Sequence, residues 1–241
     1  MNIGRISYLN VLPFYHSLEG DWGPFVEGTP AHLAKLARDG SLDAAPLPLV
    51  ETFYIEDEFE PLSNFGVACK GPVGSVLLFS RKPFDELTEA RLLFTSDSVT
   101  SAALTRYLLD RAGNHDYHVE RGDQHKGFDG YMAIGDRALR AAADPPFAHV
   151  TDLSERWFQL THLPFVFARW MIRKAVPAAD KKRLAEHLAH SLSVIPIIPD
   201  INSAGLSPRA AREYLSHIIY RLDAQCLKGI ELFRREMRVL T

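Results

Sequence analysis

The chain has 241 residues, of which 46% are apolar and 24% are charged, so it is long enough for one or two domains around a large core. Its formal net charge of -3 argues against a nucleic-acid-binding surface, which needs a concentrated basic face. The densest apolar run, residues 163–172, is interrupted by Arg169 and is too short to span a membrane. We therefore expect an enzyme-sized globular protein without nucleic-acid or membrane partners.

The N-terminal residues predict a short strand that leads into a helix. An apolar run close to Met1 ends in the polar cluster Ser7 to Asn10, and Pro13 follows. Open α/β sheets bind their ligands at the carboxyl ends of strands, so this cluster is a candidate ligand site. The basic, apolar and small-residue segments of a signal peptide are not recognisable here, and we expect a cytoplasmic protein.

The next part of the chain alternates between helix and strand. Thr29-Pro30 begins a helix, with a capping hydroxyl followed by proline in the first turn, and Gly40 ends it. A short strand over 42–45 then runs into Pro46-Leu47-Pro48. The nearly continuous apolar run within 74–81 is typical of a strand that is covered on both faces.

Further alternation follows in the middle of the chain. A strand over 91–95 leads through Ser96-Asp97-Ser98 into a helix over about 99–110. A buried strand over 131–134 turns at Gly135-Asp136 into an alanine-rich helix. Strands that alternate with helices favour an α/β fold with a mostly parallel sheet.

The last third of the chain is predicted to be helical. Leucines recur there at helical spacing, and Ser207-Pro208 caps a second helix. The leucines are Leu184, Leu188 and Leu192, and the second helix is expected to carry Tyr214, Leu215, Ile218 and Leu222.

Two apolar runs are the best candidates for segments that pass between two lobes. Residues 74–81 would lead outward and the aromatic strand over 163–173 would return. This interpretation predicts a discontinuous first lobe, residues 1–75 plus 172–241, and a second lobe over 76–171.

Polar clusters follow the predicted strands at Ser7 to Asn10, Pro46 to Pro48, Ser96 to Ser101 and Gly135-Asp136. A helix N-terminus binds carboxylates through free N–H groups, so Ser98, Thr100 and Ser101 could form an anion site. The same pattern is more often an ordinary serine N-cap with first-turn residues. Asp136 is likewise more often a plain N-cap than a catalytic acid, and Asn10 could simply stabilise a turn.

Histidines and cysteines give no recognisable metal or redox motif. His115 and His118 lie in a polar loop without further ligands nearby, and His187 and His190 fit an exposed helix face. Cys69 and Cys226 are far apart in the sequence, and we expect free thiols that pack as small apolar groups. No motif for a nucleotide or organic cofactor is present.

Six motifs follow one another along the chain at the spacing that is found in one protein family. They are Ser7-Tyr8-Leu9-Asn10 with Leu12-Pro13, Gly40-x-Leu42-Asp43-Ala44-Ala45-Pro46, Gly71-Pro72-Val73 with Ser75-Val76, Ser98-x-Thr100-Ser101, Ile134-Gly135-Asp136-x-Ala138-Leu139, and Trp157 leading to Thr161-x-Leu163-Pro164-Phe165-Val166-Phe167-Ala168. Together they resemble the chorismate dehydratase family of the futalosine route to menaquinone, over roughly residues 3–175.

The resemblance implies a two-lobed fold of the type II periplasmic binding proteins, with the substrate in the cleft between the lobes. Asn10 is then the catalytic candidate. The substrate-binding candidates are Ser7, Tyr8, Pro46, Leu47, Pro48, Ser98, Thr100, Ser101, Gly135 and Asp136. One departure concerns the segment after Pro46, where the family tends to have small hydroxyl residues and this chain has Leu47-Pro48-Leu49. Backbone contacts are therefore expected there.

The implied reaction removes water from chorismate, a dianion, and gives 3-[(1-carboxyvinyl)oxy]benzoate. A carboxamide such as Asn10 is a poor proton acceptor. We infer that the enolpyruvyl carboxylate of the substrate takes the C3 proton, while Asn10 orients this carboxylate or binds the leaving hydroxyl. Neither a metal nor an organic cofactor is required by this scheme.

Two alternatives remain open at this point. The first is a non-catalytic cytosolic protein that binds a small carboxylate in the same cleft. The second is the sister family that makes 1,4-dihydroxy-6-naphthoate, which has a Ser-Pro-Cys-type opening motif and a catalytic histidine after the later strand. Ser7-Tyr8-Leu9-Asn10 and Gly135-Asp136 stand at those places here and disfavour the sister activity.

Overall fold

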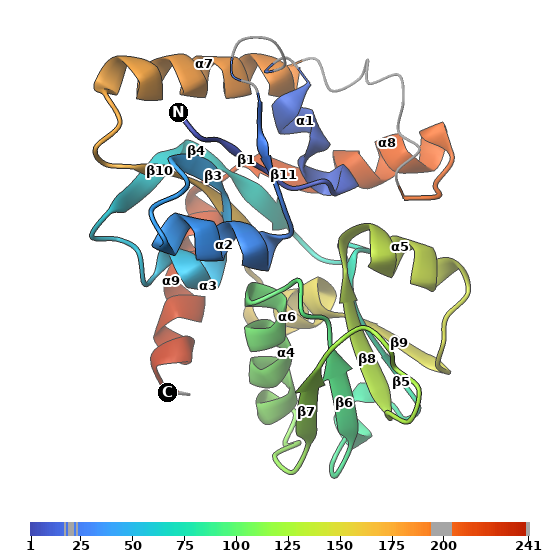
Figure 1. The fold of residues 1–241 in the computed structure, drawn as a ribbon. Coiled ribbons are helices and arrows are strands. Elements are labelled where there is room, and N and C mark those ends of the chain that lie inside the picture. Colours follow the sequence, from blue (N-terminus) through green and yellow to red (C-terminus); the bar gives the residue numbers. More distant parts are fainter. Residues whose placement is uncertain (17, 19–21, 23, 194–203, 240–241) are drawn as a thin grey trace.

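The computed structural model describes residues 1–16, 18, 22, 24–193 and 204–239. Its strands form a four-stranded sheet, a five-stranded sheet and a two-stranded pair (Figure 1). The four-stranded sheet has the order β11-β4-β10-β3, with β3 (Ala44–Pro48), β4 (Phe59–Cys69), β10 (Phe165–Arg173) and β11 (Ile218–Arg221). Its strands thus come from distant parts of the chain.

The second sheet is built from one continuous stretch of sequence. Its order is β7-β6-β8-β5-β9, with β5 (Val76–Ser80), β6 (Arg91–Phe94), β7 (His118–Arg121), β8 (Gly130–Ile134) and β9 (His149–Asp152). Every residue of β5 and β8 is buried, as predicted for a strand with both faces covered.

The prediction of a mostly parallel sheet is wrong. All strand pairs of the four-stranded sheet are antiparallel, and β5 pairs antiparallel with both neighbours. Only β6 is parallel to its neighbours β7 and β8 within the larger sheets. Helix-linked crossovers produce parallel pairs, but the strands of the four-stranded sheet are joined mainly by long excursions of the chain.

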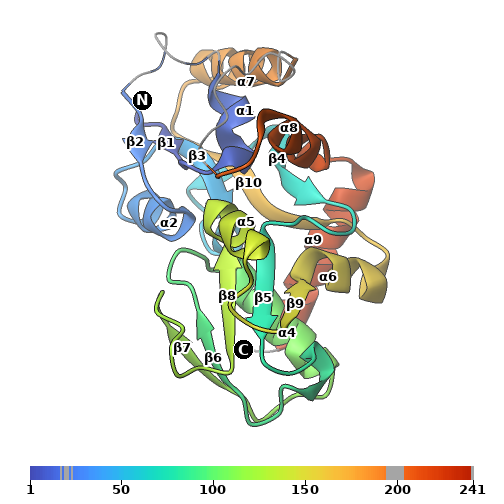
Figure 2. The ribbon, with the colours of Figure 1, turned by 90° about the vertical axis from the view of Figure 1, so that its right-hand side faces the viewer.

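Helices cover both faces of the five-stranded sheet. Helices α4 (Thr100–Arg111) and α6 (Leu153–Thr161) lie on one face, and α5 (Gly135–Ala143) lies on the other (Figure 2). Alternate residues of β5 pack toward these two faces, since Leu78 belongs to the cluster that includes α4 and α6, whereas Leu77 and Phe79 pack with Ala138 of α5. The helical segments are η1 (Leu9–Val11), α1 (Leu12–Tyr15), α2 (Pro30–Arg38), α3 (Leu49–Thr52), η2 (Phe84–Glu86), α4 (Thr100–Arg111), α5 (Gly135–Ala143), α6 (Leu153–Thr161), α7 (Ala178–Ser193), α8 (Pro208–Ser216) and α9 (Ala224–Val239). Over the described residues, none of these helices has the length and apolarity needed to cross a bilayer.

The predicted helix over the region of Tyr214 to Leu222 is wrong in its second half. Helix α8 ends at Ser216, and β11 follows and pairs with β4. Ile218, Tyr220 and Leu222 are buried, which is the two-residue alternation of a strand. The spacing of Tyr214, Ile218 and Leu222 fits both periods, so the sequence pattern alone was ambiguous.

Prolines make two strands difficult to predict from the sequence. The predicted strand over 42–45 is displaced, because β3 continues through Pro46 and Pro48; as an edge strand it tolerates residues without an N–H donor. The long strand β4 was not predicted. It contains Pro61 and Gly66, and its pairing with β10 shifts register along its length.

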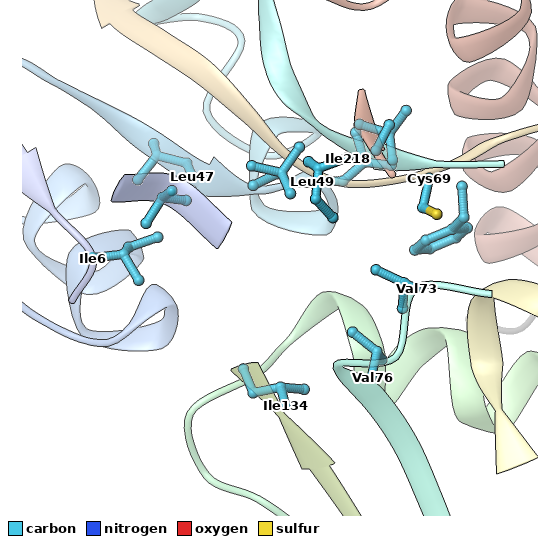
Figure 3. Close-up of a cluster of buried hydrophobic side chains, with 14 of the residues drawn as sticks. Ile6, Leu47, Leu49, Cys69, Val73, Val76, Ile134 and Ile218 are labelled. Carbon is cyan, nitrogen blue, oxygen red and sulfur yellow. The ribbon is translucent and has the colours of Figure 1, made fainter. Parts of the chain in front are cut away.

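Side chains from both sheets share one buried cluster at their junction. Val76 and Ile134, at the adjoining ends of β5 and β8, face Ile6 and Leu49 across this junction (Figure 3). The division into lobes 1–75 plus 172–241 and 76–171 remains a proposal. Because β10 pairs over its whole length with β3 and β4, we propose the second boundary near residue 164.

The environments of two cysteines and one histidine outside the polar clusters were also predicted from the sequence. Cys69 and Cys226 are free and buried, as predicted, and burial raises the pKa of each thiol to about 11. His187 does not lie on a fully exposed face, because it is half-buried and its Nδ1 accepts a hydrogen bond from Trp22 Nε1 at 2.9 Å.

Candidate functional site

Strand direction brings the predicted polar clusters together. The β1 (Gly4–Arg5) segment runs parallel to β3 through the bridge between Ile3 and Ala44, so the residues after both strands lie at one edge. In the other sheet, β6 and β8 are parallel, and their carboxyl ends lead into α4 and α5. These two edges face each other at the junction of the sheets.

A pocket lies at this junction, with a cavity volume of about 50 Å³. The lining consists of Ile6, Tyr8, Asn10, Val11, Pro30, Pro48, Val67, Val76, Ser98, Thr100, Ser101, Ile134, Gly135, Phe167 and Ala168. It therefore combines hydroxyl groups and one carboxamide with an apolar wall.

Most of the residues expected at the site line this pocket. They are Tyr8, Asn10, Pro48, Ser98, Thr100, Ser101 and Gly135. The sequence analysis missed the apolar wall, because apolar residues with the same spacing also form ordinary core. Pro30 was recognised only as a helix start, and Val67 belongs to the strand that was not predicted.

Four expected residues lie outside the lining. Ser7 is exposed and donates to Glu27 Oε2 at 2.9 Å, whereas Pro46 and Leu47 are buried within β3. Leu47 points away from the pocket because it alternates with Pro48 along the strand. The fourth residue, Asp136, is buried and accepts a hydrogen bond from Leu9 N–H at 2.9 Å. The structure therefore gives no direct pocket contact for these side chains.

Asn10 has the most unusual environment of the polar lining residues. It lies in η1, directly after the strand-like N-terminal segment, and its Oδ1 atom is buried. Within the part of the chain that the structure describes, Oδ1 has no hydrogen-bond partner. A buried amide oxygen without a partner is unfavourable by about 1–3 kcal/mol, so it is poised for a ligand donor or an ordered water.

The start of α4 combines a helix cap with pocket-facing hydroxyl groups. Ser98 Oγ accepts from Ser101 N–H at 3.1 Å, although Val99 is the residue at the cap position of α4, and Thr100 Oγ1 accepts from Val50 N–H at 3.2 Å. Arg121 Nη1 donates to the Ser98 carbonyl at 2.8 Å and fixes this loop from behind. Ser98 thus contacts the first turn of α4 from one residue before the cap position, and anion binding by Thr100 and Ser101 stays a prediction.

Tyr8 packs against Gly135 across the pocket. Gly135 has φ of +56°, and a Cβ atom at this position would lie 2.7 Å from Tyr8 Cδ2. Only glycine fits both the backbone conformation and the close approach. The Tyr8 hydroxyl donates to Asp97 Oδ2 at 3.4 Å, and burial followed by the Asp97 charge raises the phenol pKa above its ordinary value. Tyr8 is therefore a protonated donor at neutral pH.

Several of these contacts join the two sides of the pocket directly. Tyr8, Leu9 and Val50 belong to the side of the four-stranded sheet, and their partners Asp97, Asp136 and Thr100 belong to the side of the five-stranded sheet. We call these three hydrogen bonds the polar contacts of the junction. They hold the two sides together around the pocket.

No lysine or arginine is among the described residues that line the pocket, so the positive charge for an anionic ligand comes there from the backbone. The pocket is lined by the first residues of α4 and α5, and a helix N-terminus carries a partial positive charge. Gly135 N–H already donates to the Ser75 carbonyl, and Asp136 places a carboxylate in the first turn of α5. The start of α4 is therefore the better position for an anion. Among the described residues, no group of three or more His, Cys, Asp or Glu side chains is arranged to hold a metal ion.

Comparisons with known proteins give consistent matches. A family model described as menaquinone biosynthesis matches residues 1–238. A chorismate dehydratase of Thermus thermophilus is 32% identical, over 96% of this chain and 93% of that protein. A crystal structure of an Archaeoglobus fulgidus protein superposes with a TM-score of 0.82 at 13% identity, covering 99% of this chain and 97% of that one.

A more distant structure identifies the type of fold. The periplasmic aliphatic sulphonate binding protein of Escherichia coli superposes with a TM-score of 0.64 at 16% identity, covering 100% of this chain and 94% of that one. At this identity the likeness concerns the fold alone. The predicted fold class, an α/β fold of the two-lobed periplasmic-binding-protein type, is confirmed.

Proposed function

The chain belongs to the menaquinone biosynthesis family and acts as a chorismate dehydratase, and we propose that the pocket around Asn10 is its active site. The reaction removes a proton from C3 and the hydroxyl group from C4 of chorismate. Its products are 3-[(1-carboxyvinyl)oxy]benzoate and water. The apolar wall, which includes Ile6, Val76 and Phe167, offers apolar contacts to the ring of the substrate.

The observation that carries this assignment is the buried, unpartnered carboxamide oxygen of Asn10. The C4 hydroxyl group of chorismate is a donor that could satisfy this oxygen, and the amide N–H groups can donate to a substrate carboxylate. A side chain that both accepts and donates can thus orient the two parts of the substrate that react. Asn10 acts by orientation and hydrogen bonding, since a carboxamide is a poor base.

The ring carboxylate is assigned to the start of α4. Thr100 and Ser101 line the pocket there and are almost fully buried, with exposed fractions of 2% and 4%. Removal of the C3 proton spreads negative charge through the conjugated system into this carboxylate. The helix N-terminus and its hydroxyl groups stabilise that charge in a site shielded from water, where electrostatic stabilisation is most effective.

The enolpyruvyl carboxylate of the substrate is assigned as the proton acceptor. It is attached through oxygen to C3 itself, so Asn10 needs only to hold it in a reactive orientation. The Tyr8 phenol, whose pKa is raised by burial and by Asp97, stays protonated and donates its hydrogen bond to Asp97, so it does not compete for the abstracted proton. Loss of the C4 hydroxyl group, which leaves with the abstracted proton as water, then makes the ring aromatic.

Incubation of the purified protein with chorismate tests this function. We expect the aromatic product to accumulate, as followed by absorbance and identified by mass spectrometry, and the Asn10→Asp variant to form it far more slowly. Binding of chorismate without any product would instead support the non-catalytic binding protein. Chorismate left unchanged, together with formation of 1,4-dihydroxy-6-naphthoate when the substrate of the sister family is supplied instead, would support the sister activity.

A further inference from the structure

Asn10 is held in place through contacts that the two residues before it make, the ring of Tyr8 and the backbone N–H of Leu9. Tyr8 and Leu9 both contact the turn at Gly135-Asp136, which belongs to the opposite side of the pocket. Asn10 Oδ1 itself has no partner among the described residues. Since no hydrogen bond from the described residues holds this oxygen, the placement of Asn10 relies on the contacts that Tyr8 and Leu9 make.

The contact at Leu9 is the stronger of the two. A carboxylate oxygen of Asp136 accepts from Leu9 N–H at 2.9 Å, and the Asp136 residue is only 6% exposed. A hydrogen bond to a buried charged group is stronger than one between neutral groups. Leu9 is the first residue of η1, so Asp136 satisfies an N–H donor that the helix itself leaves unpaired.

The contact at Tyr8 limits movement in the same place. The aromatic ring lies so close to Gly135 that a methyl group there would approach ring atoms at 2.7–3.0 Å. Residues 8 and 9 are thus fixed by one turn, by packing and by a charge-assisted hydrogen bond. A small shift of this turn would move Asn10 relative to the pocket.

We propose that Asp136 is a positioning residue that orients the catalytic Asn10 through its hydrogen bond to Leu9 N–H, so that Asn10 is correctly placed only when the two sides of the pocket are in contact. This proposal rests on the proposed function for its kinetic consequences. Asp136 lies outside the pocket lining, so it acts on catalysis without touching the substrate. Reactive geometry is sensitive to such support, because displacements near 1 Å are already costly.

A double-mutant cycle measures this coupling. Asp136→Ala should lower kcat for chorismate dehydration by roughly 10- to 100-fold with little change in KM, as expected for a misplaced catalytic group. Asp136→Asn keeps an acceptor oxygen for Leu9 N–H and should retain most of kcat. In an Asn10→Ala background, Asp136→Ala should have little further effect, because the group that it positions is already gone.

Two results would overturn the positioning role of Asp136. Fully multiplicative effects of Asp136→Ala and Asn10→Ala on kcat would show that the two residues act independently. Asp136→Asn provides a second route if Asp136→Ala does not fold. An equally inactive Asp136→Asn variant that still protects the Leu9 amide from hydrogen exchange would also contradict the positioning role.

NMR spectroscopy tests the positioning role of Asp136 independently of the proposed function. The side-chain NH₂ signals of Asn10, identified by their loss in Asn10→Ala, should shift in ¹⁵N spectra of Asp136→Ala. Asp43→Ala is the matched control, since Asp43 accepts a backbone N–H from Asn2 at 2.6 Å on the same N-terminal segment, away from the pocket lining. Unmoved Asn10 signals would reject the positioning role even if chorismate proves not to be the substrate.

Discussion

The junction between the two sheets contains two regions that are built from different chemistry. One is an aromatic cluster of Tyr107, Trp157, Phe165 and Phe233, which come from α4, α6, β10 and α9 and have ring centroids 5.0–6.5 Å apart. The other consists of the polar contacts Tyr8–Asp97, Leu9–Asp136 and Val50–Thr100 around the pocket. Both join the same two parts of the molecule.

The two regions should differ in what they contribute. Aromatic pairs of this kind add about 0.5–1.5 kcal/mol each beyond the burial of their area, and the four rings are 0–5% exposed. A typical hydrogen bond contributes about 0.5–1.5 kcal/mol net, and several partners in the polar region face the pocket. We conclude that the aromatic cluster fixes the two parts together, while the polar region positions groups for chemistry. Mutations can separate these roles.

The largest effect is expected from Phe233→Ala in the aromatic cluster. This substitution removes a fully buried ring that contacts Tyr107, Trp157 and Phe165, so the free energy of unfolding should fall by about 3–5 kcal/mol. Chemical denaturation measures this change. Leu227→Ala, on the same helix but 42% exposed, is the control and should change stability by less than about 0.5 kcal/mol. Equal effects of the two variants would show that the cluster does not carry stability.

The second-largest effect, a fall in turnover, is expected for Asn10→Asp. The substitution keeps the size of the side chain but places a negative charge beside a dianionic substrate and removes the N–H donors. Turnover should fall by a factor of about 100 or more, as for the loss of a transition-state donor, whereas Tm should change little. Asn2→Asp, an exposed position on the same segment, is the control for the charge change. Near-normal turnover would remove Asn10 from the mechanism, and a large fall in Tm would favour a structural turn.

A smaller effect on binding is expected from Thr100→Val and Ser101→Ala. If these residues bind a substrate carboxylate, each lost charge-assisted hydrogen bond should weaken chorismate binding by about 1.5–3 kcal/mol. Thr100→Val also removes the acceptor of Val50 N–H, so its effect should include a small loss of stability that Ser101→Ala does not share. Binding titration and thermal unfolding of both variants separate these terms. Unchanged kinetic constants in both would leave only the helix-cap role of this segment.

The same contrast explains how much could be predicted from the sequence. Strand ends are marked locally by polar residues, so Tyr8, Asn10, Pro48, Thr100 and Gly135 could all be found without a structure. The features that were predicted wrongly depend on distant parts of the chain. They include the antiparallel pairing of the four-stranded sheet and the strand β11.

Asp136 shows the same limit within the site itself. Its position in the first turn of a helix was evident, and it was expected to contact the substrate. Its partner, Leu9 N–H, lies 127 residues away in the sequence, and no local pattern points to such a contact. The apolar wall was missed for a related reason, because Val67 and Phe167 have the same pattern whether they line a pocket or fill a core.

The smallest effect is expected from Tyr8→Phe, which tests the weakest of the polar contacts. The hydrogen bond to Asp97 is 3.4 Å long, and the aromatic ring that packs on Gly135 is retained. At neutral pH, the loss in free energy of unfolding should therefore be at or below the usual net value of about 0.5–1.5 kcal/mol. Turnover should fall less than in Asn10→Asp, since the contact positions η1 without reaching the reacting atoms.

The pH dependence of this variant gives the contact a signature of its own. Burial and the Asp97 charge raise the Tyr8 pKa above its ordinary value of 10.0, so the phenol keeps its proton in the folded protein when the unfolded chain loses it. Above about pH 10 the unfolded state binds fewer protons, and the stability contributed by Tyr8 falls as pH rises. Tyr8→Phe lacks this loss, so the stability difference between wild type and variant should shrink with increasing pH and can reverse. Denaturation curves at neutral and alkaline pH measure it. A difference that grows with pH would mean that the Tyr8 phenolate is stabilised in the folded protein, and the buried donor role would have to be abandoned.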